Sequence, residues 1–255
     1  MTLPRIGTLW IGPRLSAMEQ LALTSFVQQG HEVDLYTYGD VADIPAGVTV
    51  RDGNEILPES MIFMYREHRS YSGFSNYFRY RMLLERGGCW ADTDLVALRP
   101  FDFDGDHVFS SEFARGTQSI NTGFIQAPAG SPVLQRAWDL CSAKDPTQIR
   151  WGETGPTLFR SVVESLGMDA CVQPPEVFCP LPFPQWLSLL DPEAPALPPA
   201  AVAVHLWNEL WRRTDKDKDA DYDPRCMYEQ LKARYGVGRR GAVSGEGVRA
   251  TSPGR

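Results

Sequence analysis

The chain lacks several features that would place it in a particular class of protein. Its 255 residues include no apolar run long enough to span a bilayer, so a transmembrane helix is not expected. The opening stretch MTLPRIGTLWIGPR lacks the long apolar segment of a signal peptide. Lysine is scarce, with four residues, and the formal net charge of -7 argues against nucleic acid as a partner.

Cysteine is also sparse, which argues against a disulfide framework or a zinc site. The five cysteines are odd in number and widely scattered, and none belongs to a CxxC pair. We therefore expect free thiols in a reducing cytoplasm, with the inner face of the membrane as an alternative location. The membrane alternative rests on the arginines near the C-terminus: Arg239, Arg240, Arg249 and Arg255.

What is present is the composition of a globular α/β protein. Hydrophobic residues make up 43% of the chain and charged residues 22%, which allows a buried core. RIGTLWIG predicts a strand, SAMEQLALTSFVQQG a helix with Ser16 as its cap, and HEVDLYTYGD a second strand. A strand, a helix and a strand in this order form a βαβ unit, so the sheet is expected to begin parallel.

A second helix is predicted in NYFRYRMLLERGG, with Ser75 as its cap and Gly87-Gly88 at its end. The strand CWADTD follows it directly. The remaining predicted elements are strands in HVFSSEF, NTGFIQA and AVAVHLWN, and helices in SPVLQRAWDLCSA and GPTLFRSVVESLG.

The chain is predicted to form one α/β domain over residues 1–235, with a mixed, mainly parallel sheet flanked by helices. Residues 173–200 are rich in proline and predict a loop. Residues 213–225 alternate in charge and predict a mobile surface loop. Residues 236–255 have almost nothing to bury and predict a disordered tail.

Two aspartates, Asp92 and Asp94, stand one residue apart at the end of CWADTD. Residues i and i+2 of an extended segment point to the same side, so the two carboxylates repel each other unless a cation lies near them. Ligands of open α/β sheets bind at this edge of the strands, and oxygen ligands suit Mg²⁺ or Mn²⁺ beside a diphosphate. The alternative is structural: the pair caps a turn or pairs with arginines such as Arg79 or Arg99.

The stretch NYFRYRMLLERGGCWADTD resembles the central motif of glycosyltransferases with a sugar-binding DXD motif, family 32 and its relatives. The family pattern is Ser-Asp-x-x-Arg-Tyr-x-x-Leu followed by Gly-Gly-x-Tyr-x-Asp-x-Asp. The segments LPRIGTLWIG, INTGFIQAPAGSPVL, ETGPTLF and HLWNELW are also similar to family segments. The motif positions in the same register are Ser75, Asn76, Arg79, Tyr80, Leu83, Gly87, Gly88, Trp90, Asp92 and Asp94.

The resemblance implies a GT-A (Rossmann-like) fold and a metal-dependent, retaining hexosyltransferase. The donor would be a nucleotide sugar, with UDP as the expected nucleotide, and the acceptor a glycan, a lipid-linked sugar or a protein. The expected metal is Mn²⁺ or Mg²⁺. By position, Asp94 would ligate it directly, Asp92 would contact the ribose or the donor sugar and reach it through water, and His205 would be a late ligand.

The resemblance assigns further residues to the donor. Arg79 and Asn121 would contact the donor sugar and complete the catalytic set with the two aspartates. Trp10 would stack on the base and Trp207 would contact the diphosphate. Asn76 stands where the family usually has aspartate. It keeps the hydrogen-bonding shape but loses the charge, which leaves the identity of the sugar open.

Two other functions remain open. DTDLV fits the pattern of haloacid-dehalogenase-type phosphatases, with Asp92 as nucleophile, but three of the four lysines lie in or beyond the charged segment and no late acidic pair follows a strand. The second is a GT-A domain that binds nucleotide sugar without transferring it. No enzymic base is identified, and Glu153 is a pocket carboxylate without an assigned role. Core packing is the structural alternative for Trp10, His205 and Trp207.

Overall fold

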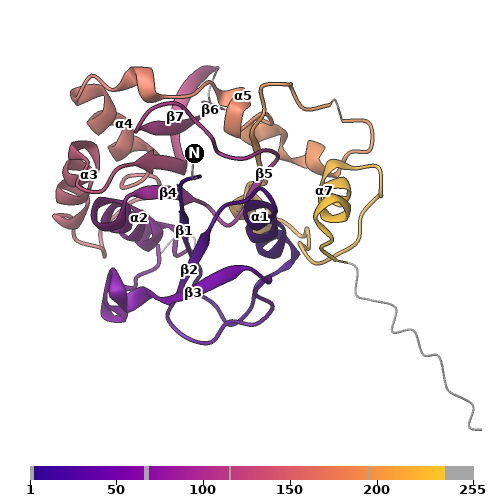
Figure 1. Cartoon of the computed structure of the whole chain (residues 1–255), viewed down its shortest axis with the longest axis horizontal. Helices are drawn as coiled ribbons and strands as arrows, with labels where there is room; N and C mark the ends of the chain where they lie inside the picture. Colours follow the sequence, from indigo (N-terminus) through magenta and orange to yellow (C-terminus); the bar gives the residue numbers. More distant parts are fainter. Residues whose placement is uncertain (1–2, 66–68, 115, 195, 239–255) are drawn as a thin grey trace, which may run out of the picture.

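A mixed sheet lies at the centre of the molecule (Figure 1). The computed structural model describes residues 3–65, 69–114, 116–194 and 196–238. In this part of the chain the strand order is β3-β2-β1-β4-β7-β6, with β7 antiparallel to both of its neighbours and the other strands parallel to one another. The strands are β1 (Ile6–Leu9), β2 (Val33–Thr37), β3 (Val48–Asp52), β4 (Gly88–Ala91), β6 (Val108–Ala114) and β7 (Thr117–Ala127).

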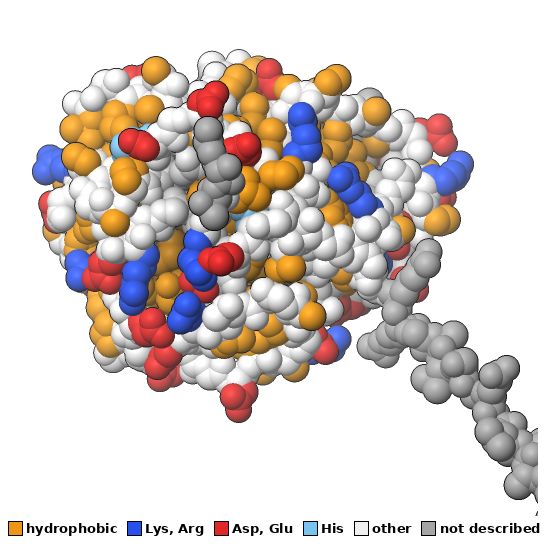
Figure 2. Space-filling view, viewed as in Figure 1, with side chains coloured by type: hydrophobic (Ala, Val, Ile, Leu, Met, Phe, Trp, Pro, Cys, Tyr) orange, Lys and Arg blue, Asp and Glu red, His pale blue; other side chains and the backbone are white. Residues whose placement is uncertain are grey.

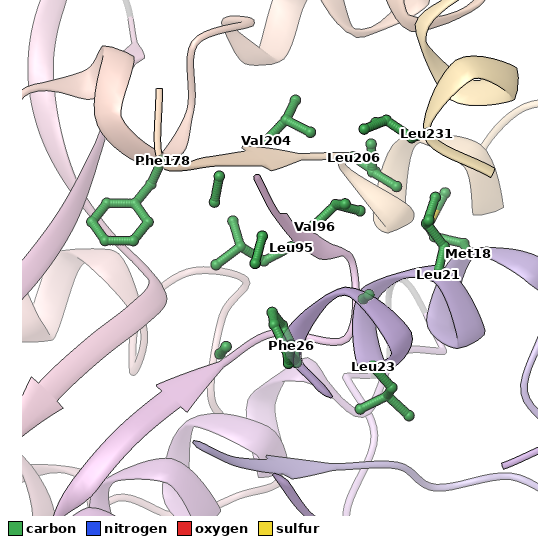
Figure 3. Packing of buried hydrophobic residues seen from close by; sticks show 14 of the residues in the cluster. Met18, Leu21, Leu23, Phe26, Leu95, Val96, Phe178, Val204, Leu206 and Leu231 are labelled. Carbon is green, nitrogen blue, oxygen red and sulfur yellow. The ribbon is translucent and has the colours of Figure 1, made fainter. Parts of the chain in front are cut away.

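Helices cover both faces of this sheet, so every residue of the central strands β1 and β2 is buried. In β4, Cys89 and Ala91 belong to the core against α1, whereas Trp90 belongs to the core against α2, α3 and α4. Side chains from α1, α7 and the strands β5 and β8 gather in the first core (Figure 3). The longer helices are α1 (Ala17–Gln28), α2 (Ser72–Arg86), α3 (Pro132–Ser142), α4 (Pro156–Ser165) and α7 (Met227–Tyr235).

Two consecutive glycines, Gly87 and Gly88, connect α2 to β4. Gly87 and Gly88 have φ values of 67° and 87°, which favour glycine. A Cβ on Gly88 would lie 2.7 Å from the carbonyl oxygen of Arg5, the same oxygen that accepts the hydrogen bond of Cys89 N–H. The glycines therefore allow β4 to pair closely with β1. This pairing positions the end of β4, which Asp92 follows.

A second, two-stranded sheet joins the middle of the chain to its late part. β5 (Leu95–Ala97) pairs antiparallel with β8 (Ala203–His205), with Leu95 opposite His205. The backbone N–H of Leu206 also donates to the carbonyl oxygen of Asp94, at 2.8 Å. This pairing places residues that are far apart in sequence at the same edge of the central sheet.

The first βαβ unit, the mixed sheet and the helices at SPVLQRAWDLCSA and GPTLFRSVVESLG are confirmed. The prediction that Ser75 caps α2 is wrong, because the helix begins one turn earlier and Tyr71 is its N-cap residue. Ser75 donates its backbone N–H to Tyr71, and its hydroxyl accepts from Arg79. The helix extends back to Ser72, and Phe74 in this added first turn is fully buried in the core.

Two predicted loops are more ordered than expected. Residues 173–200 contain the short helix α5 (Pro175–Phe178) and the 3-10 helix η4 (Phe183–Leu190), whose Phe178, Trp186 and Leu189 are buried. The charged segment 213–225 is tied to α1, because Asp219 accepts the backbone N–H of Ala17 at 2.7 Å. The expectation that this segment is mobile overlooked Tyr222, whose ring packs against Trp211 and Tyr228.

The remaining predictions concern membrane-spanning helices, the surface, the cysteines and the C-terminal tail. No helix in the described ranges combines the length and apolar character needed to cross a membrane. Acidic, basic and apolar side chains are interspersed on the face shown in Figure 2. All five cysteines are unpaired. The predicted disordered tail lies, from residue 239 onward, outside the described residues.

Candidate active site

Asp92 follows the last residue of β4, at the C-terminal edge of the sheet. Its backbone N–H donates to the carbonyl oxygen of Gly123 in β7, at 2.8 Å. Its Oδ1 accepts from Trp90 Nε1 at 2.7 Å and from Arg79 Nη2 at 3.0 Å. Oδ1 is thus engaged by two donors, and neither donor is bonded to Oδ2.

Asp94 begins the turn into β5 and meets the late part of the chain. Its Oδ1 lies 3.2 Å from His205 Nε2, and its Oδ2 accepts the backbone N–H of Asn208 at 2.7 Å. His205 ends β8, and Asn208 is the first residue of α6 (Asn208–Arg212). The β5–β8 pairing therefore brings together two predicted metal ligands that are 111 residues apart in sequence.

The three predicted metal ligands form one cluster. One ligand atom from each of Asp92, Asp94 and His205 lies within 4.8 Å of the others. Gly123 borders the cluster, since a Cβ there would lie 3.3 Å from His205 Cε1 and 3.5 Å from Asp92 Oδ2. Two carboxylates and an imidazole around this gap fit a divalent cation such as Mn²⁺.

Burial and mutual contact shift the pKa values of the cluster. Burial raises the pKa of Asp92, and Asp94 adds to this, while Arg79 opposes it. Burial would also raise the pKa of Asp94, but His205 and the Asn208 N–H outweigh burial and lower it. The pKa of His205 is raised well above its ordinary value, because Asp94 overcomes the effect of burial. Asp94 and His205 therefore form an ion pair.

Arg79 lies beneath the cluster on α2, with 5% of its side chain exposed. Besides Asp92, its guanidinium donates to the carbonyl oxygen of Thr122 and to the hydroxyl of Ser75. Its Cζ lies 4.8 Å from the centroid of the Trp90 ring. Arg79, predicted to contact the donor sugar, thus lies at the cluster. It is also the ion-pair partner of Asp92 that the structural alternative requires.

The two predicted asparagines are both buried near this edge. Asn121 Oδ1 accepts from the backbone N–H of Gly123 at 2.6 Å and from Ser110 Oγ at 3.0 Å. Asn76 Nδ2 donates to Thr154 Oγ1 at 3.3 Å. A Cβ on Gly155 would lie 3.0 Å from Asn76 Nδ2, so the Thr-Gly-Pro segment packs directly on Asn76. Both residues therefore shape the backbone around the cluster.

The two predicted aromatic contacts differ: Trp10 lines a cavity, whereas Trp207 is buried. Trp10 follows β1 and lines a cavity of about 390 Å³, together with Gly12, Tyr38, Asp40 and other residues. Its Nε1 donates to the carbonyl oxygen of Arg14 at 3.1 Å. This cavity lies at the C-terminal ends of β1 and β2, where the sequence placed the base.

Trp207 is buried and stacks on His205, with ring centroids 4.1 Å apart and planes at 29°. Its indole N–H donates to the carbonyl oxygen of Leu181 at 3.1 Å. Its φ of 59° turns the chain sharply after β8. In this arrangement Trp207 packs on the ring of His205, and its N–H is already engaged by the backbone.

Two residues near the cluster were missed at the sequence level. Glu112 in β6 interacts with His205 and Asn121; burial raises its pKa, although both of these neighbours lower it. Cys179 Sγ lies 3.8 Å from His205 Nδ1 and 3.8 Å from Asn121 Nδ2. No motif marks either residue, because only the folded sheet brings β6 and α5 to this edge. Glu153, in contrast, pairs with Lys144 at 2.6 Å near the surface.

Comparisons with known proteins agree with the resemblance read from the sequence. Lactosylceramide 4-alpha-galactosyltransferase of Pongo pygmaeus is 27% identical over 181 residues, which cover 62% of this chain and 75% of that protein. The Homo sapiens protein of the same name is 26% identical over 178 residues, and the match spans 46% of its length. No protein-family model matches the chain.

The fold has a counterpart among solved structures. The PaToxG glycosyltransferase superposes with a TM-score of 0.51 and 15% identity, over 66% of this chain and 72% of that one. The fold is the GT-A fold of glycosyltransferases, as predicted. The named relatives and the superposed structure are all glycosyltransferases, so the predicted resemblance and the predicted enzyme class are confirmed.

Proposed function

We propose that the protein is a divalent-metal-dependent, retaining glycosyltransferase that moves a hexose from a UDP-sugar to a carbohydrate-type acceptor. The observation that carries this proposal is the cluster of Asp92, Asp94 and His205 at the C-terminal edge of the sheet. Trp10 and its cavity lie at the same edge and offer an aromatic surface for a base. The named relatives transfer galactose, which supports a hexose as the transferred sugar.

The residues at the site have two roles: some would hold the cation, and others position these ligands. Asp92, Asp94 and His205 would hold the cation, which supplies positive charge against the developing charge of the diphosphate leaving group. Arg79 holds Asp92 through Oδ1 and leaves Oδ2 for the donor. Trp207 and Cys179 hold the imidazole of His205 on its face and at Nδ1. The chain thus supplies positioning and charge stabilisation.

Hydrolysis of the donor in the absence of an acceptor tests this function. With Mn²⁺ present, we expect slow release of the free hexose from a UDP-α-hexose, and no release when EDTA removes the metal. The hexose should form first as the α-anomer, because the mechanism is retaining. Proton NMR of the anomeric signal, recorded before mutarotation, measures both results. A first-formed β-anomer would exclude the retaining mechanism, and turnover of p-nitrophenyl phosphate instead would favour the phosphatase alternative.

Replacing Trp10 by alanine should weaken UDP binding by about 1–3 kcal/mol, the usual contribution of one aromatic ring stacked on a base. The expected loss applies equally to UDP and to uridine, because both carry the base. Isothermal calorimetry measures the two affinities. Trp138→Ala is the matched control, since Trp138 lies on α3 and its ring contacts Arg81, away from the cavity. Unchanged uridine binding in Trp10→Ala would show that Trp10 only packs.

A further inference from the structure

The charged segment contributes one lysine to the interior of the site. Lys218 Nζ donates to Glu19 Oε1 at 2.5 Å and to Asn208 Oδ1 at 3.0 Å. Its side chain is 18% exposed, and that of Glu19 is fully buried. The backbone carbonyl of Lys218 accepts the hydroxyl of Tyr228 at 2.7 Å. The lysine is therefore held on both its backbone and its side chain, unlike a residue of a free surface loop.

The ammonium group of Lys218 has neighbours from both parts of the proposed donor site. Nζ is 5.8 Å from the centroid of the Trp10 ring, which lines the cavity. Asn208, which accepts from Nζ, donates its backbone N–H to Asp94 Oδ2 at 2.7 Å. The positive charge of Lys218 also contributes to the lowered pKa of Asp94. Lys218 thus lies next to Trp10 and is linked through Asn208 to Asp94.

The ammonium group of Lys218 has hydrogen-bond partners for two of its three N–H donors. A lysine ammonium has three N–H donors, and within the described ranges Nζ has hydrogen-bond partners for two of them, Glu19 and Asn208. The other oxygen of Glu19, Oε2, accepts the backbone N–H of Ser16 at 2.8 Å. One donor of Lys218 is consequently free to meet an acceptor that enters between Trp10 and the cluster.

We propose that Lys218 binds the diphosphate of the nucleotide sugar, as the second cation of the site beside the metal. This inference rests on the proposed function, because it takes the base at Trp10 and the metal at the aspartates. A diphosphate spanning these two points presents several charged oxygens, and an ammonium group in a partly buried site makes strong, charge-assisted hydrogen bonds to such oxygens. Glu19 and Asn208 hold the ammonium in place before the donor arrives.

The competing interpretation is that Lys218 only neutralises the buried charge of Glu19. A pair of variants separates the two roles. Lys218→Met removes the ammonium and leaves Glu19 unpaired, whereas Glu19→Gln/Lys218→Met removes both charges together and avoids an uncompensated buried carboxylate. Lys216→Met is the matched control, because Lys216 is exposed in the same segment.

Calorimetric titration with UDP and with uridine, each in the presence of Mn²⁺, tests the inference on all variants. We expect Lys218→Met and the double variant to bind UDP about 10- to 100-fold more weakly than wild type, as the loss of one charge-assisted hydrogen bond predicts. Both should bind uridine as wild type does, and Lys216→Met should match wild type with both ligands. The double variant keeps the test valid if Lys218→Met alone does not fold.

The possible failures are distinguishable. Wild-type affinity for UDP in the double variant would overturn the role of Lys218 and leave the proposed function intact. An equal loss of UDP and uridine binding would also overturn it, because the lysine would then shape the base cavity and not the diphosphate site. If the wild-type protein binds neither UDP nor uridine with Mn²⁺, the proposed function fails and the role of Lys218 fails with it.

Discussion

Asp94→Asn should abolish Mn²⁺-dependent UDP binding and hydrolysis of the donor. The substitution keeps the size of the side chain but removes the charge that pairs with His205 and would bind the metal. Asp92→Asn should retain weak metal binding, because Arg79 and Trp90 already engage one of its oxygens. His205→Ala should fall between the two, since it removes a ligand without removing negative charge. Calorimetry with Mn²⁺ and UDP measures these affinities.

The metal-free Asp94→Asn protein should fold with a modest loss of stability, about 1–3 kcal/mol. Repulsion between the two carboxylates, expected from the sequence, is relieved in the structure because Arg79 pairs with Asp92 and His205 with Asp94. Thermal melting without metal measures the change. Asp104→Asn, at an exposed position of the segment FDFDGD, is the control and should change neither quantity. Normal Mn²⁺–UDP binding by Asp94→Asn, or a protein that does not fold, would make the pair structural.

Arg79→Ala should destabilise the protein by about 3 kcal/mol, because it leaves Asp92 without its charged partner in a largely buried position. It also removes the donor to the carbonyl oxygen of Thr122. The free energy of unfolding, measured by denaturant titration, reports the loss. Arg81→Ala is the matched control on the same helix: Arg81 is 36% exposed and pairs with Glu85, so its loss should cost about 0.5 kcal/mol or less.

A further variant tests the cause of the Arg79 effect. Arg79→Ala/Asp92→Asn should regain part of the lost stability, since the carboxylate that needs the guanidinium is gone. If the double variant is less stable than Arg79→Ala, the main contribution of Arg79 lies in its contacts with Thr122 and Trp90, and the ion pair matters little.

The sequence predicted the central motif well because its information is local. Gly87 and Gly88, the strand after them and the aspartates lie within nine residues, so helix-end and strand rules place them together. His205 could be assigned only through the resemblance, since its contact with Asp94 depends on the pairing of β5 and β8 across more than a hundred residues.

The residues that the sequence did not place reach the site through packing. Lys218 stands in a segment whose alternating charges indicate a solvated loop, and only the burial of Glu19 on α1 explains why it turns inward. Glu112 and Ser110 lie two residues apart on β6 and both interact with Asn121, but which side of that strand faces His205 is decided by the order of strands in the sheet. Propensity rules describe neighbours in the chain, and these contacts are between neighbours in space.

The pairing of Leu95 with His205 also has a consequence for the order in which the protein matures. During synthesis Asp94 leaves the ribosome 111 residues before His205, so the proposed cation site is incomplete until β8 has emerged and docked. In the folded protein, the site likewise depends on β8 and α6 staying docked. Any opening that detaches β8 and α6 disassembles the site, so a bound donor and cation would slow hydrogen exchange in this late segment more than in β2 or β3.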